Sequence, residues 1–200
     1  MAKDRSATRT EELFLTRRIR CILALFVLGL VLSGLTAFPL DWEVTVLREW
    51  TGPGTLAGRV WPGMSQWMAR VYEGLNHAGT NYPFLLYGTD WLAFAHLVIA
   101  IAFWGPLRDP VRNIWVIEFG MVACILVIPL ALICGPLRGI PFFWRLIDCS
   151  FGVVGILPLG LAHHYTRRLA MLQKKTERAI ETASRLQSLP IRSKREPGEA

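Results

Sequence analysis

Two carboxylates, Glu118 and Asp148, stand inside apolar segments that are long enough to cross a membrane. Each lies thirteen residues after the first residue of a Gly-Pro-Leu-Arg tetrapeptide, which occurs at 105–108 and again at 135–138. An ionisable group in a membrane span is costly, and it commonly marks a proton path, a transport site or a structural ion pair. These two residues are therefore the first candidates for chemistry.

The shared tetrapeptide suggests that two consecutive spans are copies of one unit. Adjacent spans run in opposite directions, so such a repeat is inverted, and inverted repeats place substrate sites near the membrane midplane in transporters. Gly followed by Pro also ends helices effectively, and so short a match arises readily by chance. We favour helix-ending chemistry, with functional symmetry as the alternative.

The two carboxylates differ in the partners that the sequence offers them. Asp148 has Arg145 three residues earlier on the same helical face, which predicts an ion pair, and His96 is predicted at a depth from which it could bond Asp148. Glu118 has no basic residue within four positions, so its predicted partner is a cation on another helix, and Arg20 is a candidate by its depth at the end of the first span. We favour a structural pair or a protonated, hydrogen-bonded Glu118 over proton transfer.

His96 has a second interpretation as the axial ligand of a haem or another tetrapyrrole. A bis-histidine site needs a second histidine at similar depth, but His163 and His164 are predicted at the opposite end of the spans and His77 in a loop. The four cysteines lack paired spacing, and no nucleotide-binding loop or hydrolase motif is present. The sequence therefore predicts no enzyme, no metal site and no cofactor.

The elements that position these residues follow from composition. Hydrophobic residues make up 52% of the chain, yet its net charge is +7, which is typical of a membrane protein with charge confined to its ends and loops. Spans of roughly 20 apolar residues predict an all-α integral membrane protein with a 1–19 arm, a 20–166 transmembrane domain and a 167–200 tail. The predicted spans are about 20–39, 89–106, 112–134 and 141–164.

Orientation is predicted from the basic residues, because short cytoplasmic segments carry the excess of Lys and Arg. Seventeen of the 22 fall in the N-terminal arm, the turn after the second span and the C-terminal tail. Both termini are thus predicted in the cytoplasm, in a bacterial inner membrane, with the long 40–88 loop outside. Tryptophans predicted to anchor the two interfaces are Trp42, Trp61, Trp67, Trp91, Trp104, Trp115 and Trp144.

Two further segments are predicted outside the spans. The outer loop begins with strand-like alternation at Trp42, Val44 and Val46, and continues into an amphipathic helix at about 63–77 that lies on the membrane or on a neighbouring protein. The tail is predicted to form a charged helix from 167, ended by Pro190 and followed by a disordered segment. Its basic residues suit anionic lipid or an acidic partner without requiring nucleic acid: Arg167, Arg168, Lys174, Lys175 and Arg178.

Three functional hypotheses follow. The first is a non-catalytic accessory or structural subunit of a larger bacterial membrane complex, of the respiratory or photosynthetic type. The second is a small homo-oligomeric, proton-coupled transporter or channel that uses Glu118. The third is a cofactor or pigment protein centred on His96, which an absorption spectrum tests directly.

Overall fold

The computed structural model describes residues 2–187, and within that range the chain is helical with no strand. Four stretches are long and apolar enough to span a membrane by length and composition, namely Ala7–Ala37, Pro83–Arg108, Ile114–Leu137 and Phe142–Thr182. The prediction of an all-α chain with four such helices is confirmed. The helices are α1 Ala2–Ala37, α2 Leu40–Thr51, α3 Leu56–Val60, α4 Pro62–Asn81, the 3-10 helix η1 Pro83–Leu85, α5 Tyr87–Ala102, α6 Trp104–Arg108, α7 Ile114–Leu137 and α8 Phe142–Gln187.

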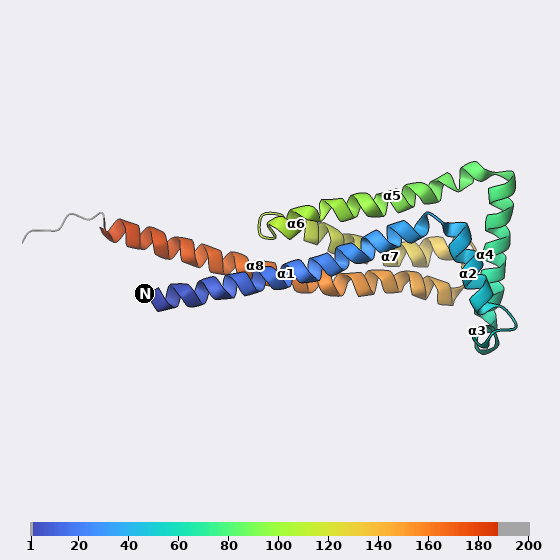
Figure 1. The fold of residues 1–200 in the computed structure, drawn as a ribbon, viewed down its shortest axis with the longest axis horizontal. Helices are drawn as coiled ribbons and strands as arrows, with labels where there is room; N and C mark the ends of the chain where they lie inside the picture. Colours follow the sequence, from blue (N-terminus) through green and yellow to red (C-terminus); the bar gives the residue numbers. More distant parts are fainter. Residues whose placement is uncertain (1, 188–200) are drawn as a thin grey trace, which may run out of the picture.

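The long helices lie side by side, and a shorter group lies across one end of them (Figure 1). Helix α1 packs against α5 and α8, and α8 packs in turn against α7. Helices α2, α3 and α4 form the crosswise arm at one end of this bundle. The beginning of α1 and the last turns of α8 extend beyond the bundle at the opposite end, which we call the projecting end (Figure 1).

Helices α1 and α8 are longer than the predicted spans at 20–39 and 141–164. No glycine or proline interrupts residues 2–28 or 161–187, and the charged residues there are good helix formers, so each helix continues outward. The two extensions are joined by an ion pair between Arg168 and Glu11 and by the Thr176 hydroxyl, 3.4 Å from a Glu12 carboxylate oxygen. The predicted disordered segment after Pro190 lies outside the described residues.

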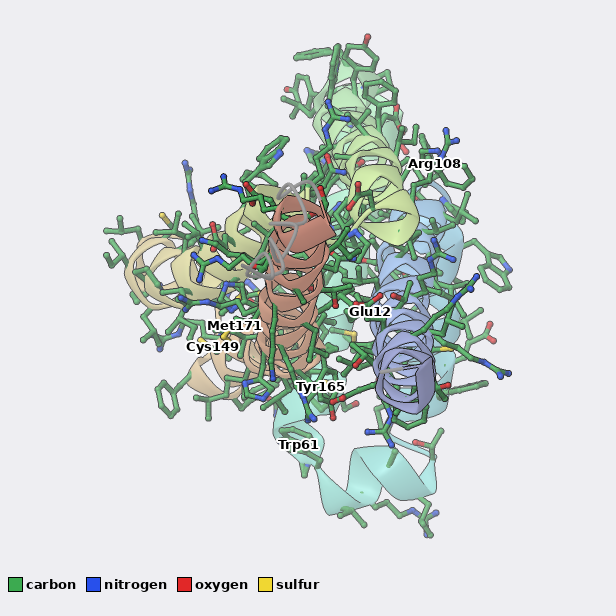
Figure 2. All side chains as sticks on the ribbon, turned by 90° about the vertical axis from the view of Figure 1, so that its left-hand side faces the viewer. Glu12, Trp61, Arg108, Cys149, Tyr165 and Met171 are labelled. Carbon is green, nitrogen blue, oxygen red and sulfur yellow. The ribbon has the colours of Figure 1, made fainter. Side chains whose placement is uncertain are left out.

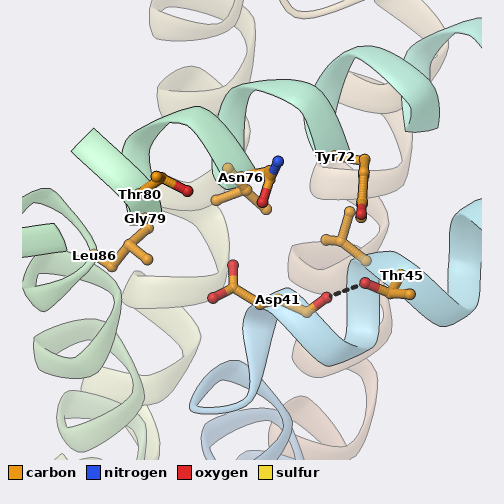
Figure 3. Close-up of a pocket in the computed structure, with 9 residues that line it drawn as sticks. Asp41, Thr45, Tyr72, Asn76, Gly79, Thr80 and Leu86 are labelled. Atoms are coloured by element: carbon orange, nitrogen blue, oxygen red, sulfur yellow. Dashed lines mark hydrogen bonds between the residues drawn. The ribbon is translucent and has the colours of Figure 1, made fainter. Parts of the chain in front are cut away.

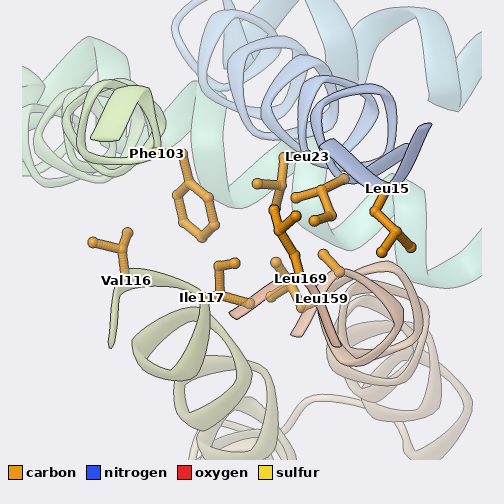
Figure 4. Packing of buried hydrophobic residues seen from close by; sticks show 9 residues of the cluster. Leu15, Leu23, Phe103, Val116, Ile117, Leu159 and Leu169 are labelled. Atoms are coloured by element: carbon orange, nitrogen blue, oxygen red, sulfur yellow. The ribbon is translucent and has the colours of Figure 1, made fainter. Parts of the chain in front are cut away.

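The hydrophobic core lies toward the projecting end and draws on all four long helices (Figure 4). Phe103, at the end of α5, is fully buried, with its ring centroid 5.0 Å from that of Phe26 on α1. The other buried members are Leu15, Ile19, Leu23, Val116, Ile117, Leu159, Ala162 and Leu169. This cluster joins the middle of α1 and of α8 to the end of α5 and the start of α7.

Toward the crosswise arm, glycines allow the helices to approach each other in pairs. A Cβ at Gly34 of α1 would lie 3.0 Å from the carbonyl oxygen of Ala93 on α5, and one at Gly152 of α8 would collide with the carbonyl oxygen of Cys124 on α7. Small residues at such crossings are characteristic of membrane helices, which gain little from the hydrophobic effect and associate through close packing. The two pairs, α1 with α5 and α7 with α8, are therefore in backbone-level contact.

The strand-like alternation predicted at Trp42, Val44 and Val46 is wrong, because these residues lie in α2. Three alternating positions are too few to separate a period of 2 from one of 3.6 residues. Asp41 and Glu43 occupy the first turn of α2, where acidic side chains favour a helix. The helix buries Val44, and its packing partner in the arm is α4.

The two Gly-Pro-Leu-Arg tetrapeptides do not stop the helices at their glycines. Residues 105–108 form most of α6, and α7 runs on to Leu137 with Pro136 inside it. A proline near a helix end loses few backbone hydrogen bonds, because the helix is about to end anyway. Within the described residues only Gly139 has a positive φ, at 70°. The left-handed residue therefore follows the second tetrapeptide, at 135–138, and is not the glycine that begins it.

Candidate functional site

The structure pairs Glu118 of α7 with His163 of α8. Glu118 Oε1 and His163 Nε2 are 3.0 Å apart. The Glu118 side chain is 55% exposed and that of His163 is 20% exposed. A carboxylate and an imidazole at this distance share a proton, either as an ion pair or as a neutral hydrogen bond.

The suggested pairing of Glu118 with Arg20 is not formed. Arg20 Nη2 instead donates to the backbone carbonyl of Arg108, at 3.0 Å. The signal for His163 was available in the α7–α8 hairpin: Glu118 lies twenty residues before Arg138, and His163 lies twenty-two after Pro141. Positions at similar distances from the turn of an antiparallel helix pair lie side by side, whereas charge and expected depth indicated Arg20.

The surroundings of the pair are apolar and face outward from the bundle. Trp115, Phe119 and Val122, on the same stretch of α7, are all exposed. Helix α7 begins at Ile114, so Glu118 lies about 6 Å along the helix axis from its start, at 1.5 Å per residue. The pair therefore lies within the apolar span and close to its projecting end.

Asp148 meets neither of its predicted partners among the described residues. Arg145 places its guanidinium 5.2 Å from the ring centroid of Phe142, and its Nε is buried without a hydrogen bond. His96 Nδ1 lies 2.8 Å from the carbonyl oxygen of Leu92 on its own helix. Because α5 packs mainly against α1, His96 and Asp148 are kept on different helix pairs.

The bond from His96 Nδ1 to a backbone carbonyl is also the arrangement that orients metal-ligating histidines, with Nε2 directed at the metal. In the described part of the chain, however, no three His, Cys, Asp or Glu side chains are grouped so as to hold a metal ion. Cys21, Cys124, Cys134 and Cys149 are all unpaired thiols. Among the described residues, His96 is therefore not part of such a group.

Aromatic contacts fasten the crosswise arm to the α7–α8 hairpin. The ring centroids of Trp61 and Phe143 are 5.0 Å apart, and those of Trp67 and Trp144 are 6.3 Å apart. Trp67 and Trp144 are therefore partly buried packing residues in addition to predicted interfacial anchors. The other predicted anchors, Trp42, Trp91, Trp104 and Trp115, have exposed side chains.

A cavity lies at each end of the bundle, and the sequence predicted neither of these two. One, of about 330 Å³, lies between α2 and α4 and is lined by Asp41, Thr45, Tyr72 and Asn76 among others (Figure 3). The other, of about 360 Å³, lies at the projecting end between α1, α8 and the turn after α6. Each is assembled from segments far apart in the sequence, which explains why no local motif indicates it.

Comparison with known proteins finds no match to this chain. No protein-family model matches the chain. No curated protein matches it significantly, and no solved structure does so either.

The basic residues of the α8 extension divide into two groups. Arg168 is paired with Glu11 of α1, so it holds the two extensions together. Arg167, Lys174, Lys175 and Arg178 have exposed side chains. Arg168 therefore pairs within the chain, and the remaining four residues stay predicted contacts for anionic lipid or an acidic partner.

Proposed function

We propose that the chain is a non-catalytic docking subunit of a larger membrane assembly. The observation that carries this proposal is the outward-facing Glu118–His163 pair, whose carboxylate is 55% exposed on an apolar helix surface. Lipid chains solvate a carboxylate poorly, whereas a neighbouring protein can offer it hydrogen bonds. A partner helix that covers this face therefore explains the pair better than lipid does.

The shape of the molecule supports the same proposal. Large apolar side chains are exposed on each of the four apolar spans, for example Leu25, Phe94, Ile125 and Phe151. The crosswise arm and the paired extensions add surfaces at the two ends of the bundle (Figure 1). The assembly we propose is of the respiratory or photosynthetic type in a bacterial inner membrane, with both termini cytoplasmic.

The test is purification from the native membrane in mild detergent. We expect the chain in a stable particle with other, different polypeptides. Glu118→Ala should reduce its recovery in that particle, because the variant removes the polar contact of the covered face. Glu177→Ala is the control, since Glu177 is an exposed carboxylate on the α8 extension. Recovery of the wild-type chain only as a monomer or homo-oligomer would contradict the proposal.

A second candidate function is a homo-oligomeric, proton-coupled transporter or channel. The 3.0 Å contact between Glu118 and His163 favours it, since such a pair can accept and release a proton within the span. In this function a second copy covers the pair, and no foreign subunit is required.

Proton flux into liposomes, reported by an enclosed pH-sensitive dye, tests the second function. Glu118→Gln should lower the flux at least about tenfold if the carboxylate carries the proton. Glu177→Gln should leave it unchanged. Equal flux through wild-type protein and Glu118→Gln, or no flux above that of empty liposomes, would remove this candidate.

A further inference from the structure

The cavity at the projecting end is built from three separate segments of the chain. Thr16 comes from α1, the end of α6 and the turn that follows it supply Arg108, Asp109 and Arg112, and α8 supplies Leu169 and Gln173. Figure 2 views the bundle from this end, with Arg108 at the end of α6. Polar side chains and an apolar wall thus meet in a volume of about 360 Å³.

The turn that supplies the two arginines is held in one conformation by its own hydrogen bonds. Asn113 Nδ2 donates to the carbonyl oxygens of Asp109, at 2.9 Å, and Gly105, at 3.2 Å. The backbone N–H of Arg112 donates to Asp109 Oδ1 at 3.0 Å. Arg20 ties the turn to α1 through the carbonyl of Arg108. These hydrogen bonds hold the turn without any contribution from a ligand.

The charges at the cavity favour an anion. Within the described residues, the side chains of Arg108 and Arg112 form no ion pair, and both residues are exposed. The one acidic lining residue, Asp109, already accepts the Arg112 N–H. Two guanidinium groups match the oxygen geometry of a phosphate and bind it through charge-assisted hydrogen bonds. Gln173 can add a neutral donor.

The position of the cavity indicates where such a phosphate comes from. One apolar span ends at Arg108 and the next begins at Ile114, so the turn between them lies at the level where spans give way to headgroups. Leu169 and Val111 provide an apolar wall beside the arginines. Basic pockets of this kind at the ends of spans suit lipid headgroups.

We propose that this cavity binds the phosphate group of an anionic ligand through Arg108 and Arg112. A membrane lipid headgroup is the source that the position favours, and a soluble phosphorylated molecule is the other source. The site is separate from the Glu118–His163 pair and stands whether or not the chain docks in a larger assembly.

Native mass spectrometry of the full chain in mild detergent tests the site. We expect the protein to retain phosphatidylglycerol more strongly than phosphatidylcholine. The double variant Arg108→Gln/Arg112→Gln should weaken phosphatidylglycerol binding at least about tenfold. The matched control is Lys174→Gln/Lys175→Gln, which removes the same charge from exposed positions on α8 that do not line the cavity, and it should bind like wild type.

A titration with sodium phosphate distinguishes the two sources. Inorganic phosphate that binds as tightly as phosphatidylglycerol, with the same loss in the arginine variant, supports the site with a soluble ligand. Equal weakening in both double variants, or none in either, would overturn the proposal. Gln173→Leu provides a check that removes no charge: it should weaken lipid binding while the helical circular dichroism stays unchanged.

Discussion

Phe103→Ala is expected to lower the free energy of unfolding by about 3 kcal/mol. The Phe103 ring is fully buried where all four long helices meet and contacts the Phe26 ring. Its removal leaves a cavity that the neighbouring helices α1, α7 and α8 cannot close without moving. Unfolding in mixed micelles of mild detergent and dodecyl sulfate, followed by tryptophan fluorescence, measures the change.

Phe94→Ala is the matched control for this variant. Phe94 lies on the same helix, α5, but its side chain is exposed, so its truncation opens no cavity. We expect a change of less than about 0.5 kcal/mol. Similar losses in the two variants would show that the cluster around Phe103 is not the part of the bundle that limits stability.

Gly152→Ala is expected to destabilise the bundle by about 2 kcal/mol. The added Cβ collides with the backbone carbonyl oxygen of Cys124, which cannot rotate away as a side chain can. Helices α7 and α8 must therefore separate. This cost has to exceed the roughly 1 kcal/mol that alanine gains over glycine in a helix.

Gly160→Ala makes the same change eight residues further along α8, where nothing but the surrounding backbone of α8 lies within 4 Å of the added Cβ. It should be neutral or stabilise by up to about 1 kcal/mol. The same unfolding experiment compares the two alanine variants directly. A stabilised Gly152→Ala would mean that α7 and α8 do not approach as closely at Cys124 as the structure has them.

The candidate residues could be predicted from the sequence, but their partners could not. That Glu118 is a carboxylate in need of a partner, within a stretch apolar enough to span a membrane, followed from its neighbours in the sequence alone. The distances of Glu118 and His163 from the α7–α8 turn place them at similar heights, but whether their side chains face each other depends on how the two helices are rotated about their axes, which no local pattern encodes. The same holds for Asp148 and His96, since the predicted bond between them required α5 and α8 to be direct neighbours, and α5 packs mainly against α1.

The amino-acid sequence by itself determined that the chain is helical, that four stretches can span a membrane and where the basic residues gather. These properties depend on the hydropathy and charge of consecutive residues, so they are local. Only the tertiary structure decided that Glu118 meets His163, that α1 and α8 continue as a joined pair, and that the turn after α6 closes a cavity with Thr16 and Gln173. Those contacts join residues far apart in the chain, and side-chain packing at the helix crossings selects them.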